Sequence, residues 1–284
     1  MGTVYLNGRY LPLEEATVSV LDRGFIYGDG VYELIPVYKR RPYRLPQHLA
    51  RLQNSLDRIR LANPHSEAQW ATIVDALVAK QPFDDQGVYF QVTRGAAKRD
   101  HAFPKDATPT VFMMSNPLAT PSKEVIDDGV ACVTALDERW LNCDIKSISL
   151  LGNVLMRQFA ADRDAVETVM FRNGYLTEAS ASNVLIVKDG VVIAPPKDRL
   201  ILPGITYGAI YELALQGGIP FEMRPVRESE VWKADELWLS SSTKEVVAIV
   251  TLDGVPVGHP SHVGRPGPML MKMHALFQKG KVAA

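Results

Sequence analysis

The sequence predicts a two-domain α+β protein, and three observations lead to this prediction. The chain has 284 residues, which is more than one hydrophobic core usually organises. Short strand-like runs alternate with two amphipathic helical stretches in the first 115 residues, and a segment with two prolines follows them. We therefore expect a small N-terminal domain over 1–115, an interdomain linker over 116–122 and a larger C-terminal domain over 123–284.

The N-terminal domain is expected to begin with a β-hairpin, because Asn7-Gly8 is a strong signal for a two-residue turn. A longer strand is predicted over Val31–Tyr38. Leucines at helical spacing predict a helix that begins at Pro46, a favoured first helical residue, and a second helix is predicted around Trp70. The other expected strands are 4–6, 9–11, 88–93 and 111–114.

The C-terminal domain is expected to contain many short strands. A strand is predicted over Val130–Leu136 and a helix over about 150–162. Tight turns follow at Asn173-Gly174, Asp189-Gly190 and Asp253-Gly254. Short strands joined by such turns favour a largely antiparallel or barrel-like sheet with helices on its outside.

The composition excludes several classes of function. With 31 Lys+Arg and 32 Asp+Glu, the formal net charge is -1, so we expect neither nucleic acid nor a membrane surface as a partner. The six histidines lack metal-ligand spacing, and no metal site is expected. Only Cys132 and Cys143 occur, and no signal-like or membrane-spanning segment is evident, which indicates a cytoplasmic protein.

Two short motifs suggest other functions. Gly28-Asp29-Gly30 begins like a dinucleotide fingerprint, but Glu33 stands where the third glycine belongs and a strand follows. Ser241 and Lys244 match the S-x-x-K pattern of serine-lysine hydrolases, although the companion motifs of those enzymes are missing. The hydrolase remains a remote alternative.

Four segments carry a family resemblance, and they read RGFIYGDGVYE (23–33), WLNCDIKSISLLGNVL (140–155), YLTEASASNV (175–184) and ILPGIT (201–206). With them the chain resembles the fold-type IV pyridoxal 5'-phosphate (PLP) enzymes, from about residue 3 to residue 278. The resemblance implies a small α/β N-terminal domain, a larger pseudo-barrel C-terminal domain and a cofactor at the domain interface.

Lys146 is the expected catalytic residue. Most lysines are solvated surface amines, but Trp140, Leu141, Cys143 and Ile145 surround this one in the sequence. Apolar surroundings favour a neutral, nucleophilic amine. The resemblance implies that Lys146 binds PLP covalently and moves the proton of the substrate α-carbon.

Further cofactor contacts are implied by the resemblance. Glu178 is expected to pair with the pyridine nitrogen of PLP, and Arg51, in the helix after Pro46, is expected to clamp the phosphate. The remaining expected contacts are the N-terminus of a helix at Ile205 and Thr206, the hydroxyl-rich loop at Ser242 and Thr243, and Leu202 against the back of the cofactor ring.

Other residues indicate which substrate the enzyme binds. Arg99 and His101 match an R-x-H element which, together with Tyr32, is implied to trap the substrate α-carboxylate. Leu34 is expected to face the substrate. In the family, the R-x-H residues enter the site of the neighbouring subunit, so a homodimer is expected. The text EASASN at 178–183 departs from the branched-chain pattern and favours the D-amino acid branch.

We therefore expect a PLP-dependent transaminase that moves the amino group of a D-amino acid, such as D-alanine or D-glutamate, to an α-keto acid such as 2-oxoglutarate or pyruvate by a ping-pong mechanism. Within the same family, an (R)-amine transaminase, a branched-chain aminotransferase and aminodeoxychorismate lyase are the alternatives.

Overall fold

The computed structural model describes residues 2–283. The chain divides into two compact units, which we call the N-unit and the C-unit. The N-unit comprises Met1–Ala119 and Ile145–Leu150, and the C-unit comprises Thr120–Asp144 and Leu151–Ala284.

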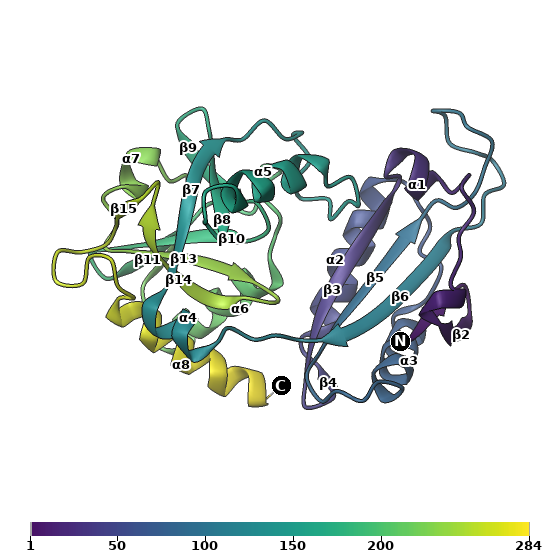
Figure 1. The fold of residues 1–284 in the computed structure, drawn as a ribbon, viewed down its shortest axis with the longest axis horizontal. Helices are drawn as coiled ribbons and strands as arrows, with labels where there is room; N and C mark the ends of the chain where they lie inside the picture. Colours follow the sequence, from purple (N-terminus) through teal and green to yellow (C-terminus); the bar gives the residue numbers. More distant parts are fainter. Residues whose placement is uncertain (1, 284) are drawn as a thin grey trace. The chain divides into compact units, whose positions relative to one another are not determined.

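The N-unit is built on a sheet with the strand order β2-β1-β6-β5-β3-β4, in which neighbouring strands are antiparallel (Figure 1). The predicted hairpin at Asn7-Gly8 is confirmed as the turn between β1 and β2. The strands are β1 (Thr3–Leu6), β2 (Arg9–Pro12), β3 (Gly30–Tyr38), β4 (Arg41–Pro42), β5 (Gln86–Thr93) and β6 (Thr110–Pro117).

Helices α2 (Leu45–Arg58) and α3 (Glu67–Ala79) pack against the sheet of the N-unit, and α1 (Arg23–Tyr27) follows the short 3-10 helix η1 (Leu13–Glu15). The leucines that predicted α2 are buried on the helix face that packs against β3, where they exclude water from the core. Strand β3 alternates: Val31, Glu33 and Ile35 are buried, whereas Tyr32 and Leu34 are half-buried on its other face.

Residues 145–150 belong to the N-unit. The linker predicted over 116–122 places them in the C-terminal domain instead. The segment pairs with the beginning of β3: the backbone N–H of Tyr32 donates to the carbonyl of Lys146 (2.9 Å), and that of Ile148 donates to the carbonyl of Gly30 (3.1 Å). Backbone pairing between distant segments leaves no mark on local composition, so the sequence did not predict it.

The C-unit contains a sheet with the strand order β12-β11-β10-β13-β14-β7-β8-β9, and β15 pairs with β14 beside this path. The pairs β7–β8, β7–β14 and β11–β12 are parallel and the other pairs are antiparallel. Strand β9, at one end of this order, also contacts β10, which is near the other end. The sheet therefore curls, in agreement with the predicted barrel-like domain. The strands are β7 (Val130–Leu136), β8 (Glu167–Arg172), β9 (Tyr175–Ala179), β10 (Asn183–Lys188), β11 (Val191–Ala194), β12 (Phe221–Met223), β13 (Glu236–Ser241), β14 (Glu245–Leu252) and β15 (Val255–Pro256).

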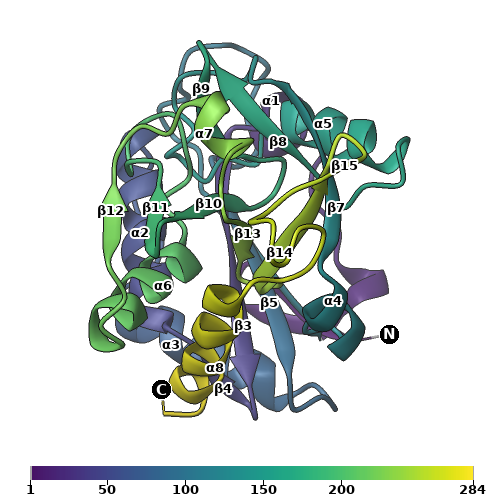
Figure 2. The same ribbon diagram turned by 90° about the vertical axis from the view of Figure 1, so that its left-hand side faces the viewer.

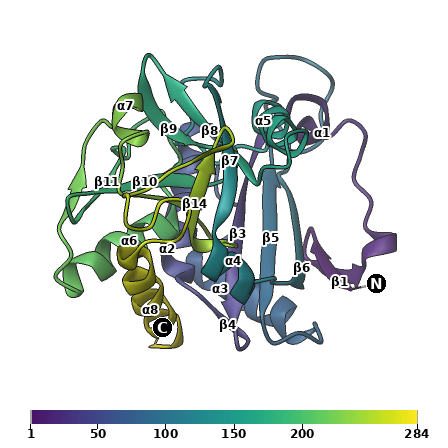
Figure 3. The same cartoon turned by 60° about the vertical axis from the view of Figure 1, so that its left-hand side comes forward.

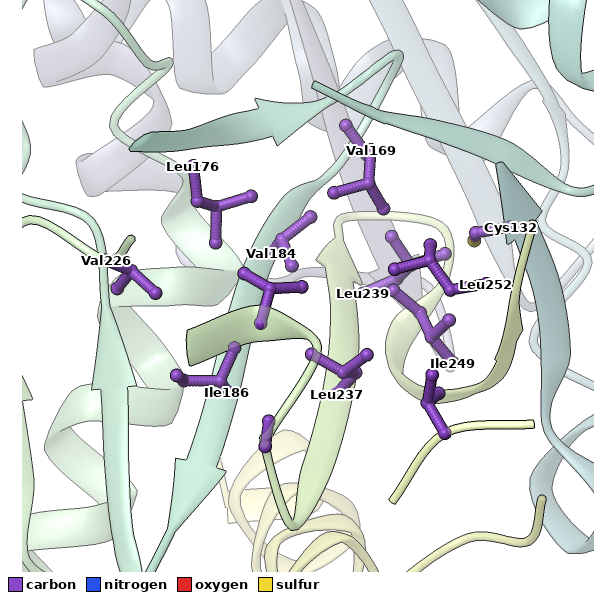
Figure 4. Close-up of a cluster of buried hydrophobic side chains, with 14 of the residues drawn as sticks. Cys132, Val169, Leu176, Val184, Ile186, Val226, Leu237, Leu239, Ile249 and Leu252 are labelled. Carbon is purple, nitrogen blue, oxygen red and sulfur yellow. The ribbon is translucent and has the colours of Figure 1, made fainter. Parts of the chain in front are cut away.

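The core of the C-unit lies on both faces of this sheet. Leu237 and Leu239 of β13 point into one apolar cluster together with Ile249 (Figure 4). Trp238, between them, belongs to a second cluster that α6 and α8 cover, and these two helices lie side by side (Figure 2). Helix α5 packs on β7 and β8 (Figure 3). The helices are α4 (Lys123–Asp128), α5 (Leu151–Ala161), α6 (Ile205–Gln216), α7 (Glu228–Val231) and α8 (Pro268–Ala283).

This architecture confirms the α+β prediction. Among the described residues, no helix has the length and apolar character needed to span a membrane.

Candidate active site

Lys146 is held by its backbone in the N-unit. Its N–H donates to Ser55 Oγ (3.2 Å), and its carbonyl accepts from the N–H of Tyr32 (2.9 Å). The side chain is half-buried, and Nζ lies 4.2 Å from the centroid of the Tyr32 ring. The lysine amine and the tyrosine that the resemblance assigns to the substrate are thus neighbours in the structure.

The apolar surroundings predicted for Lys146 are only partly present. Cys143 and Ile145 are buried, but Trp140 and Leu141 expose 50% and 57% of their surface. Cys143 and Ile145 thus support the predicted apolar surroundings, whereas the exposed Trp140 and Leu141 do not, because apolar neighbours in sequence need not point in the same direction.

A buried charged cluster lies on the opposite face of β3. Glu33 accepts from Arg51 Nε (2.7 Å) and Nη2 (2.8 Å), and its Oε2 also lies 2.7 Å from His48 Nδ1. Burial alone would raise the pKa of Glu33, but Arg51 and His48 outweigh it and hold the pKa far below its usual range. Burial lowers the pKa of His48 and keeps its imidazole neutral at pH 7, although Glu33 opposes the shift.

This cluster adds an observed partner to Arg51, whose predicted role as a phosphate ligand stays a prediction. The sequence suggested a phosphate ligand, and the structure shows its guanidinium bound to both oxygens of Glu33. Sequence reasoning missed Glu33 and His48 as partners in this cluster. A single acidic residue inside the apolar run VYELIPVY was the available signal, because a carboxylate is rarely buried without a partner.

Tyr32 and Leu34 share their face of the sheet with two residues that the sequence patterns did not single out. Tyr32 pairs with Gln91 and Leu34 with Tyr89 in the register of β3 and β5. The hydroxyl of Tyr89 donates to Gln91 Oε1 (2.7 Å), and the rings of Tyr32 and Tyr89 lie 5.6 Å apart. Alternation along a strand predicts such pairs only when the partner strand and its register are known.

Arg99 and His101 lie on an exposed loop of the N-unit, between β5 and β6. Both contact the ring of Tyr27: Arg99 Cζ lies 5.5 Å from its centroid, and the imidazole centroid of His101 lies 5.4 Å from it. The structure therefore brings the two R-x-H residues together on one aromatic side chain.

Glu178 is buried in the C-unit at the end of β9. Its Oε1 accepts from Arg139 Nη1 (2.7 Å), and its Oε2 accepts from the backbone N–H of Leu202 (3.0 Å) and from Asn183 Nδ2 (3.2 Å). Burial raises the pKa of Glu178 to about 7, although Arg139 pulls in the opposite direction. Asp137, which binds Arg139 through Nε (2.9 Å), fixes the guanidinium from its other side.

Leu202, Ile205 and Thr206 lie together where α6 begins. Asn183 links this segment to Glu178, because its Nδ2 also donates to the carbonyl of Leu202 (2.9 Å). Gly204 is the N-cap of α6, and a Cβ there would overlap Asn183 Oδ1. The close approach requires glycine and leaves the N–H groups at the start of the helix able to bind an anion.

Ser242 and Thr243 form the turn between β13 and β14 and are half-buried. The next residue, Lys244, places Nζ 2.8 Å from Oε1 of the fully buried Glu167. The ammonium group of Lys244 is thus bound to a carboxylate and not to the hydroxyl of Ser241. The backbone N–H of Lys244 donates to Ser241 Oγ (3.1 Å), which is a turn contact. This geometry argues against the serine-lysine hydrolase.

Comparison with known proteins identifies the family to which the chain belongs. The sequence pattern described as amino-transferase class IV matches residues 30–252. The chain belongs to the class IV aminotransferases. It is 38% identical over 275 residues to the D-alanine aminotransferase of Bacillus licheniformis, covering 97% of this chain and 95% of that protein.

Solved structures show the same fold for this class IV aminotransferase. It matches the branched-chain amino acid aminotransferase of Escherichia coli with a TM-score of 0.90 at 24% identity, covering 98% of this chain and 94% of that one. A second match is the branched-chain aminotransferase of Thermoproteus uzoniensis with norvaline, with a TM-score of 0.87, 25% identity and coverage of 98% and 94%. A third, also a branched-chain amino acid aminotransferase, was solved with pyridoxamine 5'-phosphate and matches with a TM-score of 0.90 at 22% identity. The fold-type IV prediction is thereby confirmed.

Proposed function

We propose that this class IV aminotransferase is a PLP-dependent transaminase of D-amino acids. D-Alanine and D-glutamate are the expected amino donors, an α-keto acid such as 2-oxoglutarate or pyruvate is the acceptor, and the two half-reactions follow a ping-pong mechanism. The observation that carries this proposal is the identity of 38% to a D-alanine aminotransferase along 97% of the chain.

The residues of both units fit the chemistry of PLP. The N-unit offers an amine at Lys146 with a fixed backbone, and the C-unit offers the buried Glu178 carboxylate and a helix N-terminus at Thr206. Two hydroxyl groups, of Ser242 and Thr243, add donors for a phosphate. An aldehyde, a pyridine nitrogen and a phosphate are the groups that such a donor set binds.

Within this function, Lys146 binds the cofactor and carries the proton to and from the substrate α-carbon. PLP, when bound, would supply the electron sink that this proton transfer requires. Glu178 would hold the proton of the pyridine nitrogen, and Arg139 keeps the Glu178 carboxylate oriented through its 2.7 Å bond. Leu202 would pack against the ring of the bound cofactor, and its phosphate would be held by Ile205, Thr206, Ser242, Thr243 and Arg51.

The carboxylate of the substrate is assigned to Arg99, His101 and Tyr32, with Leu34 beside the substrate side chain. We infer a homodimer in which Arg99 and His101 serve the site of the other subunit. In support, both residues are exposed, and apolar side chains of the N-unit shortly before Tyr27 are exposed as well, among them Val20 at 74% and Phe25 at 75%. Exposed apolar surface of this kind favours an interface.

We also infer that the protein works in the cytoplasm, since both Cys132 and Cys143 are free thiols buried in the C-unit. The alternative substrates, L-branched-chain amino acids and primary (R)-amines, are supported by the shared fold alone and therefore rank below D-amino acids.

Lys146→Ala tests the proposal, with the exposed Lys233→Ala as a matched control. Each purified protein is mixed with PLP, and its visible absorbance is recorded before and after D-alanine and, separately, L-leucine. We expect the wild type and the control to bind PLP and to respond to D-alanine alone, and Lys146→Ala to lose covalent binding and essentially all turnover.

A response to L-leucine alone would move the enzyme to the branched-chain group. Transamination that persists in Lys146→Ala would remove the lysine from the mechanism, and a wild type that binds no PLP would contradict the proposed function as a whole.

A further inference from the structure

We propose that Arg23 is a positioning residue that fixes the loop 98–103, so that Arg99 and His101 are presented in the geometry that binds a substrate carboxylate. The inference rests on the proposed function of these two residues. Arg23 itself lies on α1, does not act on the substrate and holds the loop through its main chain.

Arg23 binds three consecutive carbonyl groups of the loop. Its Nη1 donates to the carbonyls of Asp100 (2.5 Å) and Ala102 (3.3 Å), and its Nη2 donates to that of His101 (3.4 Å). Its side chain is only 4% exposed, so these bonds are shielded from water. A guanidinium has several donors in a fixed plane, and this suits it to hold successive carbonyls.

An ion pair with Asp29 holds the guanidinium of Arg23 in place. Its Nε donates to Asp29 Oδ2 (2.7 Å), and the same oxygen accepts from Arg94 Nε (2.8 Å). Arg94 in turn donates to the carbonyl of Ile59 at the end of α2 (2.7 Å). The loop is therefore tied, through Arg23 and Asp29, to a helix of the N-unit core.

Aromatic contacts fix the two ends of the loop. The ring of Tyr27 lies 4.8 Å from Arg23 Cζ and contacts both Arg99 and His101. Beyond Ala102, the ring of Phe103 lies 3.7 Å from Arg94 Cζ. The main chain is thus held from inside while the side chains of Arg99 and His101 stay exposed.

This arrangement has a physical consequence for binding. An exposed loop without these ties samples many conformations, and a ligand that needs one of them must supply the entropy of ordering it. Because Arg23 orders the loop before the substrate arrives, its loss should weaken the binding of the carboxylate more than it slows the chemical step at Lys146.

Three variants test the proposal: Arg23→Gln removes the charge and most donors, Arg23→Lys keeps the charge without the planar fork, and Arg9→Gln is a control on an exposed arginine of β2. Hydrogen–deuterium exchange of the cofactor-free proteins reports on the loop independently of activity. We expect at least tenfold faster exchange at the N–H groups of Ala97 and Ala102, which donate to Leu21 and Asp100, in both Arg23 variants. Exchange over β5 should stay unchanged, and Arg9→Gln should show no change.

Steady-state kinetics with D-alanine give the second measurement. We expect the KM to rise at least tenfold in Arg23→Lys, with kcat altered less than threefold and PLP affinity unchanged. A residue with only a general structural role would lower kcat and PLP affinity together with exchange protection. That outcome, or loop exchange equal to wild type, would overturn the positioning role.

Arg99→Ala separates this inference from the proposed function. If Arg99→Ala leaves the KM for D-alanine unchanged, the assigned carboxylate site is wrong, and the claim that Arg23 sets substrate affinity is overturned with it. The exchange data then still decide whether Arg23 holds the loop. If Arg99→Ala raises the KM and Arg23→Lys does not, only the positioning inference is overturned.

Discussion

Two opposing effects set the pKa of Glu178. Its carboxylate is removed from water, which favours the protonated form, and yet it receives hydrogen bonds from Arg139, Asn183 and the backbone of Leu202, which favour the ionised form. Burial prevails and raises the pKa to about 7. A group with this pKa holds or releases its proton near neutral pH, which suits a partner of a pyridine nitrogen.

The raised pKa of Glu178 predicts how the stability of the cofactor-free protein depends on pH. In the folded state the carboxyl binds its proton up to about pH 7, whereas the unfolded chain releases it near its ordinary value of ~4.3. The stabilisation of the folded state by protonated Glu178 is therefore fully present below about pH 4.3 and is lost as the pH rises through about 7. Glu178→Gln does not titrate, so its stability relative to wild type should improve by about 1–3 kcal/mol between pH 4.5 and pH 8.

Urea unfolding of both cofactor-free proteins at the two pH values measures this difference, and an exposed Glu14→Gln variant serves as the control. A difference between Glu178→Gln and wild type that is the same at pH 4.5 and pH 8 would mean that Glu178 is ionised throughout.

At the scale of elements, the start of α6 is closely packed against Asn183. Gly204 packs so closely on Asn183 that a Cβ cannot be accommodated without movement, and Asn183 also binds Glu178. Asn183 therefore connects the N-terminus of α6, at Gly204, with Glu178.

Gly204→Ala is expected to displace Asn183 and the first turn of α6. Overpacking of this kind costs about 1–3 kcal/mol, and the affinity for PLP should fall at least tenfold because the helix N-terminus and Glu178 are both affected. Gly208→Ala, in the same helix, is the matched control: the nearest atom to its Cβ is Lys197 Nζ at 3.6 Å. That variant should gain about 0.5–1 kcal/mol. Thermal denaturation and PLP titration test both, and equal PLP affinity in the two variants would contradict the role assigned to Gly204.

At the scale of the whole molecule, the proposed homodimer can be tested at the exposed apolar residues of the N-unit. Phe25→Asp should prevent dimer formation, because a charge would have to be buried at the interface. Val255→Asp, on the exposed hairpin strand β15, is the control and should leave the assembly unchanged.

Sedimentation velocity measures both variants, and D-alanine turnover should fall together with dimer content if Arg99 and His101 act across the interface. A Phe25→Asp protein that remains dimeric would place the interface elsewhere, and a monomer with full activity would contradict the shared site.

The elements were predictable because their signals are local. Helix α2 was expected from Pro46 and its leucine spacing, and the first hairpin from Asn7-Gly8; both are present with small differences at their ends. Lys146 and Glu178 could also be selected from sequence, since the motifs around them resemble a known family. By contrast, the role of Glu33 and the tie between Arg23 and the loop 98–103 depend on residues far apart in the chain, and no local pattern encodes these contacts.

The sequence by itself determined the α+β class and the class IV family, because hydrophobic periodicity, turn chemistry and family motifs are properties of short segments. Only the tertiary structure decided that residues 145–150 join the N-unit, that Arg51 binds Glu33, and that Lys244 is paired with Glu167. Each of these depends on which distant backbone or charge a folded chain brings within hydrogen-bonding distance, and buried charges must find such partners.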